Sequence, residues 1–274
     1  MRARRRHARG GGRKQGGTGG FEARPVISLC MIVRDEEQFL RKCLESARGV
    51  ADEIVAVDTG SRDSTVSIAR EFGARVVEFT WSDDFAAARN QALAAASGQW
   101  MLVLDADERL DAATAPRIRQ AALRGGFDAG YLRFLNMAEG GPGGQEWLAP
   151  RLYRLRPGLR WVGRIHEQVA CGAGEVRRRE VGATVYHYGY QAAVCAQRQK
   201  RERAARLLQK ALEDPEAQDP LLRANYLFHH ANQAGGEELL DRYERLAAFV
   251  RETWPQEPPR APWITGGLAE YARL

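Results

Sequence analysis

The sequence predicts an α/β fold in which a mixed sheet is flanked by helices and is followed by a small C-terminal segment that is all helical. Two observations carry this prediction. Between residues 26 and 123, short apolar runs alternate with stretches whose apolar residues recur at helical spacing. From residue 191 onward the strand-like runs stop and only helical patterns remain. Alternation of strand and helix implies right-handed crossovers and parallel strands that are covered on both faces.

Four strands and four helices are predicted in the first half of the chain. The strands are VISLCMIV (26–33), EIVAVD (53–58), ARVVEF (74–79) and QWMLVLD (99–105). The helices are the stretch 36–47, a helix after the turn TGSRDS, the alanine-rich run 83–96 and a helix from Pro116 to about Leu123. The first strand is apolar at nearly every position, as expected for a parallel strand that is buried on both faces.

The second half predicts further strands and then three helices. The strand-like stretches are AGYLRFLNM (129–137), WLAPRLYRL (147–155), RWVGRIHEQVA (160–170) and VGATVYHYGY (181–190), and EGGPGGQ (139–145) is predicted to be a flexible loop. The helices cover 197–213, 219–235 and 236–254, with breaks at Pro215, Pro220 and the pair Gly235 and Gly236. Their spacing resembles that of tetratricopeptide helix pairs, although no clean full repeat is present.

The net charge of +6 is concentrated at the N-terminus. Residues 1–20 contain seven arginines and lysines and no acid, so the rest of the chain is close to neutral. We therefore expect no specific nucleic-acid partner. The segment 1–24 is rich in arginine and glycine and poor in apolar residues, which predicts disorder. It would either contact an anionic surface weakly or be inert.

The sequence favours a cytoplasmic protein. It has neither the apolar core of a signal peptide nor a run of about 18 apolar residues. Its four cysteines form no CxxC pair and match no zinc spacing, and Cys30 and Cys43 lie among predicted core residues, which fits a reducing compartment. A peripheral position at the inner face of the membrane, held through the basic tail, stays open.

Polar side chains follow the predicted parallel strands. Arg34 and Asp35 follow the first strand, and Asp58 and Asp105 end the second and the fourth. In open sheets, ligands bind at these carboxyl ends. The residues after the first strand read RDEEQF, so neither a GxGxxG dinucleotide fingerprint nor a P-loop is present there. Two common nucleotide-binding schemes are therefore disfavoured.

Three carboxylates, those of Asp105, Asp107 and Glu108, follow a single apolar strand. Like charges this close resist burial unless water or a cation lies between them. Mg²⁺ and Mn²⁺ are hard cations that bind carboxylate oxygens together with substrate phosphates. The pair Asp105 and Asp107 alone would also fit a solvated turn or a helix cap.

Seven stretches follow one another between Val26 and Tyr190. They are SLCMIVRDEEQFLRKCLES, DEIVAVDTGSRDST, WSDDFAAARNQAL, QWMLVLDADERL, PRLYRL, GRIHEQV and HYGY. Together they resemble glycosyltransferase family 2, and in particular the bacterial branch of lipopolysaccharide-core glucosyltransferases and peptide S-glycosyltransferases, whose catalytic domain is often followed by tetratricopeptide-like helices. The resemblance implies a GT-A type nucleotide-binding domain at residues 25–190 and a tetratricopeptide-like helical segment at 191–274, after the disordered tail at 1–24.

The resemblance also implies roles for individual residues. Asp58 and the exit of the first strand at Val33, Arg34 and Asp35 would bind the nucleotide base or ribose; a carboxylate at position 58 would equally cap the following turn. Arg89 and Asn90 match the family's RN pair, in which Asn90 would brace the nucleotide loop. Asp107 would be the principal ligand of Mn²⁺ or Mg²⁺, Asp105 would contact ribose or metal, and His187 would be a late third ligand; a lone histidine is more often an ordinary core or surface residue.

Members of this family invert the anomeric centre, which requires a general base on the acceptor side. Glu167 in IHEQ is the candidate base, and the neighbouring His166 would contact the diphosphate or be the base itself. Many relatives carry the base within an ED-like motif, which is absent here. A salt-linked surface turn is the alternative for this pair.

The resemblance predicts an enzyme that moves a hexose from a nucleotide-diphosphate sugar, expected to be UDP-linked, to a saccharide, lipid-linked or peptide acceptor. One alternative is a sugar-phosphate nucleotidyltransferase, which would show a glycine-rich loop and a lysine after the first strand. Another is a non-enzymatic scaffold in which residues 191–253 bind a partner.

Overall fold

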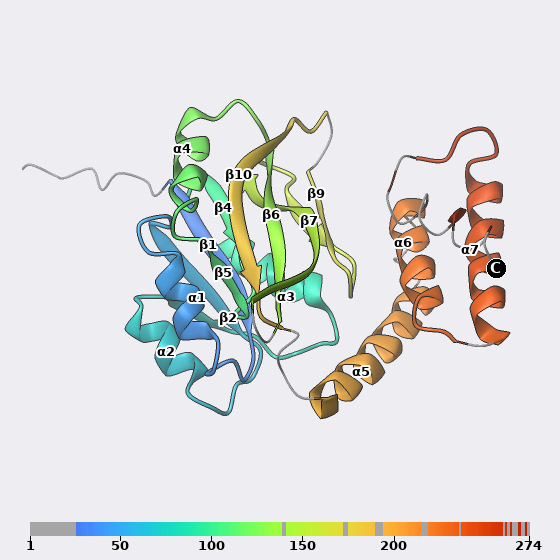
Figure 1. The fold of residues 1–274 in the computed structure, drawn as a ribbon, viewed down its shortest axis with the longest axis horizontal. Coiled ribbons are helices and arrows are strands. Elements are labelled where there is room, and N and C mark those ends of the chain that lie inside the picture. The colour runs from blue at the N-terminus through green and yellow to red at the C-terminus, as the bar shows by residue number, and fades with distance from the viewer. Residues whose placement is uncertain are drawn as a thin grey trace, which may run out of the picture.

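The computed structural model describes residues 26–138, 141–171, 175–189, 194–214, 219–235, 237–259 and five single positions, 261, 264, 268, 269 and 272. The predicted disorder of residues 1–24 lies outside this part of the chain. Figure 1 shows a sheet with helices on both faces, and the helices close to the C-terminus lie to one side of it.

Eight of the strands in the described residues form one mixed sheet, in the order β3-β2-β1-β4-β7-β6-β10-β5. Their bounds are β1 (Ile27–Val33), β2 (Glu53–Asp58), β3 (Arg75–Glu78), β4 (Trp100–Val103), β5 (Glu108–Leu110), β6 (Ala129–Ala138), β7 (Gly141–Arg154) and β10 (Arg178–His187). A second ribbon pairs β8 (Arg160–Val162) with β9 (Gln168–Ala170).

The N-terminal half of the sheet is parallel. The strand β1 lies between β2 and β4, and both neighbours run in its direction. Val33 pairs with Asp58 at the ends of β1 and β2. The chain therefore leaves β1, β2 and β4 at one edge of the sheet, where the predicted site residues Arg34, Asp58 and Asp105 follow, as the sequence indicated.

The two faces of the sheet carry separate apolar cores because side chains alternate along each strand. Leu29 and Met31 of β1 face a core that includes α1 (Leu40–Ser46), α2 (Thr65–Glu71) and α4 (Pro116–Arg124). Cys30 faces the opposite core, which includes α3 (Phe85–Ala95). Asp84 caps α3 by accepting a hydrogen bond from Ala87 N at 2.8 Å, which fixes the start of this helix.

The structure differs from the sequence prediction at two places in the sheet. Residues 141–145, predicted to be part of a flexible loop, belong to β7, which pairs with β6 as far as Gly141 opposite Ala138. Glycine and proline weaken a strand pattern, but pairing along β6 supplies the backbone partners here. The short strand β5 was not predicted, because three residues give no period to detect.

The three predicted C-terminal helices are confirmed as α5 (Val194–Glu213), α6 (Pro220–Ala231) and α7 (Glu237–Thr253), which we call the helical appendage. Helices α6 and α7 share a core of their own that includes Tyr243 and Leu246. A further cluster joins Leu207 and Leu208 of α5 to Ile165 of the sheet domain. Within the described residues, none of the helices is both long enough and apolar enough to cross a membrane.

Candidate functional site

Asp58 at the end of β2 holds the turn that follows it. Its carboxylate accepts hydrogen bonds from the Ser61 hydroxyl at 2.5 Å and from Gly60 N at 3.2 Å, and the residue is buried. The capping role left open by the sequence is therefore present in this structure. Asp58 also lies beside the exit of β1, since Thr59 N donates to Val33 O at 3.0 Å.

The exit of β1 turns sharply and is tied to the same turn. Asp35 has a left-handed backbone with φ of 54°, and its carboxylate accepts a hydrogen bond from Arg62 N at 2.7 Å. Arg34 and Asp35 are both exposed and lie 3.9 Å apart at Nε and Oδ2. Polar side chains thus frame the carboxyl ends of β1 and β2 while remaining open to solvent.

A cavity of about 480 Å³ lies against the exit of β1. Three of the predicted nucleotide-binding residues, Val33, Arg34 and Asp35, line it. The other lining residues are Ile32, Glu36, Phe39, Thr59, Trp81, Phe85 and Arg203. Aromatic rings and charged groups in one hollow of this size suit a planar base joined to an anionic group.

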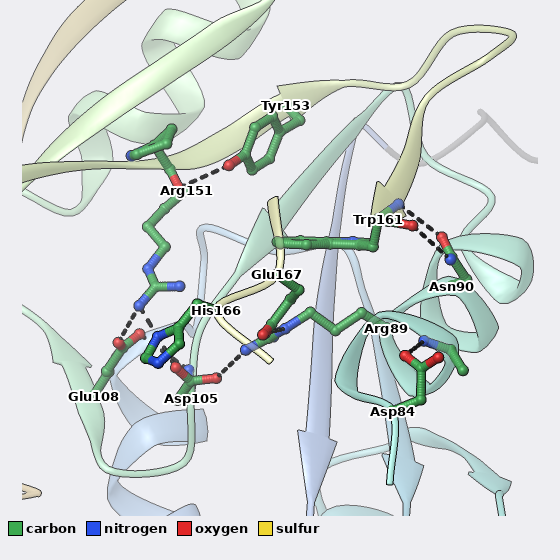
Figure 2. A network of polar contacts seen from close by, with 12 residues as sticks. Asp84, Arg89, Asn90, Asp105, Glu108, Arg151, Tyr153, Trp161, His166 and Glu167 are labelled. Atoms are coloured by element: carbon green, nitrogen blue, oxygen red, sulfur yellow. Dashed lines mark hydrogen bonds and ion pairs between the residues drawn. The ribbon is translucent and has the colours of Figure 1, made fainter. Parts of the chain in front are cut away.

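Arg89 on α3 links two predicted site residues (Figure 2). Its Nε donates to Glu167 Oε1 at 2.5 Å and its Nη2 donates to Asp105 Oδ1 at 3.0 Å. Only 10% of the Arg89 side chain is exposed, so the pair is largely shielded from water. The carboxylates raise the pKa of Arg89 against the opposing effect of burial.

Arg151 on β7 is a second counterion of the acidic turn. Its guanidinium donates to Glu108, and its Nη2 lies 3.5 Å from Asp105 Oδ2 (Figure 2). Burial alone would raise the pKa of Asp105, but the charges of Arg89 and Arg151 hold it at about 2. For Glu108, burial prevails and raises its pKa to about 7. Two arginines therefore offset the repulsion between the carboxylates. The sequence had indicated water or a bound cation in this role.

Asp107 and His187 form the open part of the acidic turn. His187 Nε2 lies 3.5 Å from Asp107 Oδ2, and the hydrogen bond to Asp107 raises the pKa of the histidine. The other ring nitrogen, Nδ1, lies 2.9 Å from Asn136 Oδ1. An amide oxygen can only accept, so Nδ1 carries a proton. Nε2 therefore donates to Asp107 only when the ring is doubly protonated, and in the neutral ring its lone pair faces the Asp107 carboxylate.

Two acceptors that face each other are satisfied by a proton or by a cation. The Asp107 carboxylate fits Mn²⁺ or Mg²⁺, and the imidazole nitrogen of His187 favours Mn²⁺ over the harder Mg²⁺. No group of three or more histidine, cysteine or acidic side chains arranged to hold a metal occurs among the residues the structure describes. The Asp105 carboxylate is paired with Arg89 and Arg151. A bound cation would thus take Asp107 and His187 from the protein and its other ligands from substrate or water, which is the usual habit of Mg²⁺.

Gly189 packs against both of these candidate ligands. A Cβ atom built on it would overlap Asp107 Oδ2 and would lie 2.8 Å from His187 Nε2. The neighbouring Tyr188 N donates to Asp107 O at 2.8 Å. Residues 187–189 therefore close over the acidic turn, and any side chain at position 189 would have to displace the Asp107 carboxylate and the His187 ring.

The predicted catalytic pair His166 and Glu167 lies on a loop between β8 and β9. His166 has a left-handed backbone with φ of 52°. Its ring stacks on His229 of α6 with centroids 3.4 Å apart, and its carbonyl accepts a hydrogen bond from Asn225 Nδ2 at 3.2 Å. Burial lowers the pKa of His166. The appendage thus holds the loop that presents Glu167 to Arg89.

Asn90 lies one residue from Arg89 but points to a different partner. Its Oδ1 accepts from Trp161 N at 2.9 Å and its Nδ2 donates to Trp161 O at 3.0 Å (Figure 2). Asn90 therefore braces β8 against α3 in this structure. Its predicted contact with a nucleotide loop stays a prediction.

Three features of the site were not anticipated. Arg151 pairs with Glu108 and Asp105, an arrangement that the sequence did not indicate. The residues of α6 that hold the loop of His166, and Arg203 in the cavity, come from a segment read as a separate helical unit. The alternation of Arg151 and Tyr153 along one strand was the available signal, and it does not identify the acids that Arg151 contacts.

The family model for glycosyl transferase family 2 matches residues 28–181. The chain belongs to this family. A tetratricopeptide repeat-containing protein of Synechococcus elongatus is 39% identical over 206 residues, which is 69% of this chain and 48% of that protein. The SPbeta prophage-derived glycosyltransferase SunS of Bacillus subtilis is 25% identical over 240 residues, covering 84% of this chain and 53% of SunS. This family 2 chain spans about half the length of these curated relatives.

Solved structures bear on the fold. A crystal structure of S. aureus TarS 1–349 in complex with UDP-GlcNAc is 16% identical, covers 82% of this chain and 81% of that chain, and has a TM-score of 0.50. At this identity the likeness concerns the fold alone. Together with the eight-stranded mixed sheet of the described residues, it confirms the predicted GT-A architecture of this family 2 chain.

Proposed function

We propose that this chain is an inverting glycosyltransferase that moves a hexose from a UDP-linked donor to an acceptor, with the help of Mn²⁺ or Mg²⁺. The observation that carries the proposal is the meeting of Arg89, Asp105 and Glu167 at the carboxyl ends of the parallel strands of a family 2 domain. We take residues 25–190 as the catalytic unit and residues 191–274 as a tetratricopeptide-like segment.

The donor nucleoside is assigned to the cavity at the exit of β1. Val33, Arg34 and Asp35 line this cavity, and Asp58 and Thr59 lie at its border with β2. The aromatic side chains of the cavity offer a stacking surface for the base. The diphosphate would then extend toward the acidic turn of β4.

Asp107 and His187 are the proposed protein ligands of the divalent cation. The bound ion would supply positive charge to the leaving diphosphate. Asn136 supports this assignment, because its contact with Nδ1 keeps Nε2 of His187 directed at Asp107. Asp105, which is paired with Arg89 and Arg151, is assigned to the ribose side rather than to direct coordination.

Glu167 is the proposed general base of a single displacement. The acceptor proton moves to the Glu167 carboxylate, the acceptor atom bonds to the anomeric carbon, and the bond from that carbon to the diphosphate oxygen breaks with its electron pair on UDP. Arg89 fixes one carboxylate oxygen of Glu167 at 2.5 Å, which leaves the second oxygen for the acceptor. His166 is assigned to the positioning of this loop and to the diphosphate side.

The proposed acceptor is a saccharide, a lipid-linked saccharide or a peptide, and the reaction is placed in the cytoplasm. The relatives with printed glycosyltransferase names and the UDP-GlcNAc complex of TarS support the donor class. The free thiols of the buried Cys30 and Cys43 fit a reducing compartment. The basic segment 1–24 is proposed to contact anionic surfaces weakly.

Thermal unfolding in the presence of UDP, GDP, CDP or dTDP, each with and without Mn²⁺, tests the donor and metal assignments. A ligand that binds the native state raises the midpoint temperature by mass action. We expect a shift with UDP that requires Mn²⁺ and is absent in Asp107→Ala, whose own midpoint should be unchanged or slightly higher because a like charge is removed. The absence of a shift with every nucleotide would contradict the proposal and favour a non-enzymatic binding module.

A further inference from the structure

One residue of the helical appendage lies in the proposed donor cavity. The other residues that line the cavity belong to the sheet domain, whereas Arg203 belongs to α5. The cavity is therefore completed by two parts of the chain that are far apart in sequence. A ligand in it would touch both.

The position of α5 over this cavity is fixed by an apolar contact and by charge. Leu207 and Leu208 are fully buried in a cluster that includes Trp81 and Phe85, two residues of the cavity wall. Asp83, between these two aromatic residues, accepts from Arg206 and from Lys210, each at 2.6 Å. These hydrogen bonds hold the pKa of Asp83 well below its usual range. Arg203 lies one turn before this anchor and is carried to the cavity by it.

Arg203 differs from its basic neighbours on α5 in the groups that its charge contacts. Arg206 and Lys210 are both paired with Asp83. In the described part of the chain, the Arg203 guanidinium has one recorded contact, over the Phe85 ring at 5.8 Å from the centroid. A guanidinium has five donors that match phosphate oxygens. Arg203 thus presents a full positive charge to the cavity.

We propose that Arg203 binds the phosphate groups of the nucleoside diphosphate donor, so that the appendage forms part of the donor site. This inference rests on the proposed function and adds a residue to it. Asp35 and Glu36 also line the cavity and would repel a diphosphate, so a diphosphate bound there needs a cation such as Arg203 to offset these acids. The Phe85 ring keeps the planar guanidinium at the wall, which reduces the entropy lost when the ligand binds.

The test measures the dissociation constants of UDP and of uridine for the full chain and for Arg203→Gln, in the presence of Mn²⁺. A charge-assisted hydrogen bond to phosphate corresponds to a loss of about 10- to 100-fold in UDP affinity. Uridine lacks phosphate, so its affinity should change by less than about twofold on the same reasoning. Arg203→Lys keeps the charge and should recover part of the UDP affinity.

Arg245→Gln on α7 is the matched control, because it removes the same charge from a side chain that pairs with Asp241. It should bind UDP as the unaltered chain does. Equal UDP affinity in Arg203→Gln and the unaltered chain would overturn the inference, and so would an equal loss for UDP and uridine, which would indicate a purely structural role. Failure of the unaltered chain to bind UDP would instead contradict the proposed function itself.

Discussion

Arg89 Nε lies 2.5 Å from Glu167 Oε1, although 78 residues separate them in the sequence. The same guanidinium also bonds to Asp105 at the end of β4. The proposed base on the acceptor side and the acidic turn on the donor side therefore share one buried cation. A change at Arg89 should affect both.

Arg89→Ala should lower the free energy of unfolding by roughly 3 kcal/mol, because it leaves two shielded carboxylates without their counterion. Denaturant unfolding measures this loss. Arg245→Ala is the control, since its exposed pair with Asp241 is worth only roughly 0.5 kcal/mol. Equal small losses in the two variants would show that Arg89 is not a structural counterion.

Glu167→Gln should reduce sugar transfer by roughly 10²- to 10⁴-fold, because the amide keeps the shape of the side chain but cannot accept the proton. The affinity for UDP should stay nearly unchanged. Transfer rates with an acceptor that the unaltered chain uses, and titration with UDP, give the two readouts. Glu180→Gln, at an exposed position of β10, serves as the control. Full transfer by Glu167→Gln would rule it out as the base.

Gly189→Ala should remove most of the Mn²⁺-dependent stabilisation by UDP, because the new methyl group overlaps the Asp107 carboxylate and crowds the His187 ring. Thermal unfolding with UDP and Mn²⁺ reports the effect. Gly235→Ala is a suitable control, since nothing lies within 4 Å of a Cβ at that position. If both variants respond to Mn²⁺ and UDP like the unaltered chain, Asp107 and His187 are not the cation ligands.

Acidification should loosen the contact between the appendage and the loop of His166. Burial and the adjacent His166 lower the pKa of His229 from its ordinary 6.5 to about 3. Above pH 6.5 both rings are neutral and the stacking contributes fully. As the pH falls below that value, the unfolded chain takes up protons that the folded chain excludes, so stability is lost progressively toward pH 3.

His229→Phe keeps an aromatic ring on His166 and cannot titrate. Between pH 7.5 and pH 5.5, its midpoint temperature should therefore fall less than that of the unaltered chain. The comparison cancels the contributions of the other histidines, which both proteins share. Equal falls in the two proteins would show that His229 does not bind fewer protons in the folded state.

Local patterns were sufficient to predict the parallel half of the sheet and its ends. Buried runs such as 26–33 and 53–58 are long enough to show their character, and the polar residues after them mark the edge where ligands bind. The strand β5 and the first residues of β7 were not predicted. They are strands because they pair with β10 and β6, and such pairing depends on the tertiary fold and not on the local sequence. Alternation of apolar and polar residues along a segment indicates which face of a strand is buried, but it does not indicate which strand pairs with it.

The candidate site residues could be named from the sequence, but the side chains that form ion pairs and hydrogen bonds with them could not. The DxD motif and His187 stood out from the family resemblance, and the structure brings His187 to Asp107. That Asp105 would be held by Arg89 and Arg151 could not be read from the sequence, because ion pairs across 16 or more positions depend on how the sheet and helices pack. The docking of α6 on the loop of His166 was hidden for the same reason.

The contacts of the appendage limit how this chain can be recombined with its relatives. Helix α5 rests on the segment around Asp83 through a hydrogen bond between side chains, from Arg206 to Asp83. Helix α6 rests on the loop of Arg164 and His166, where its side chains bond to the loop backbone. A chimera that replaces residues 194–259 alone would meet mismatched loops on both flanks of the catalytic centre. A working graft should exchange residues 81–85 and 163–167 together with the helices, so the appendage and the two segments that it contacts are expected to be inherited as one block.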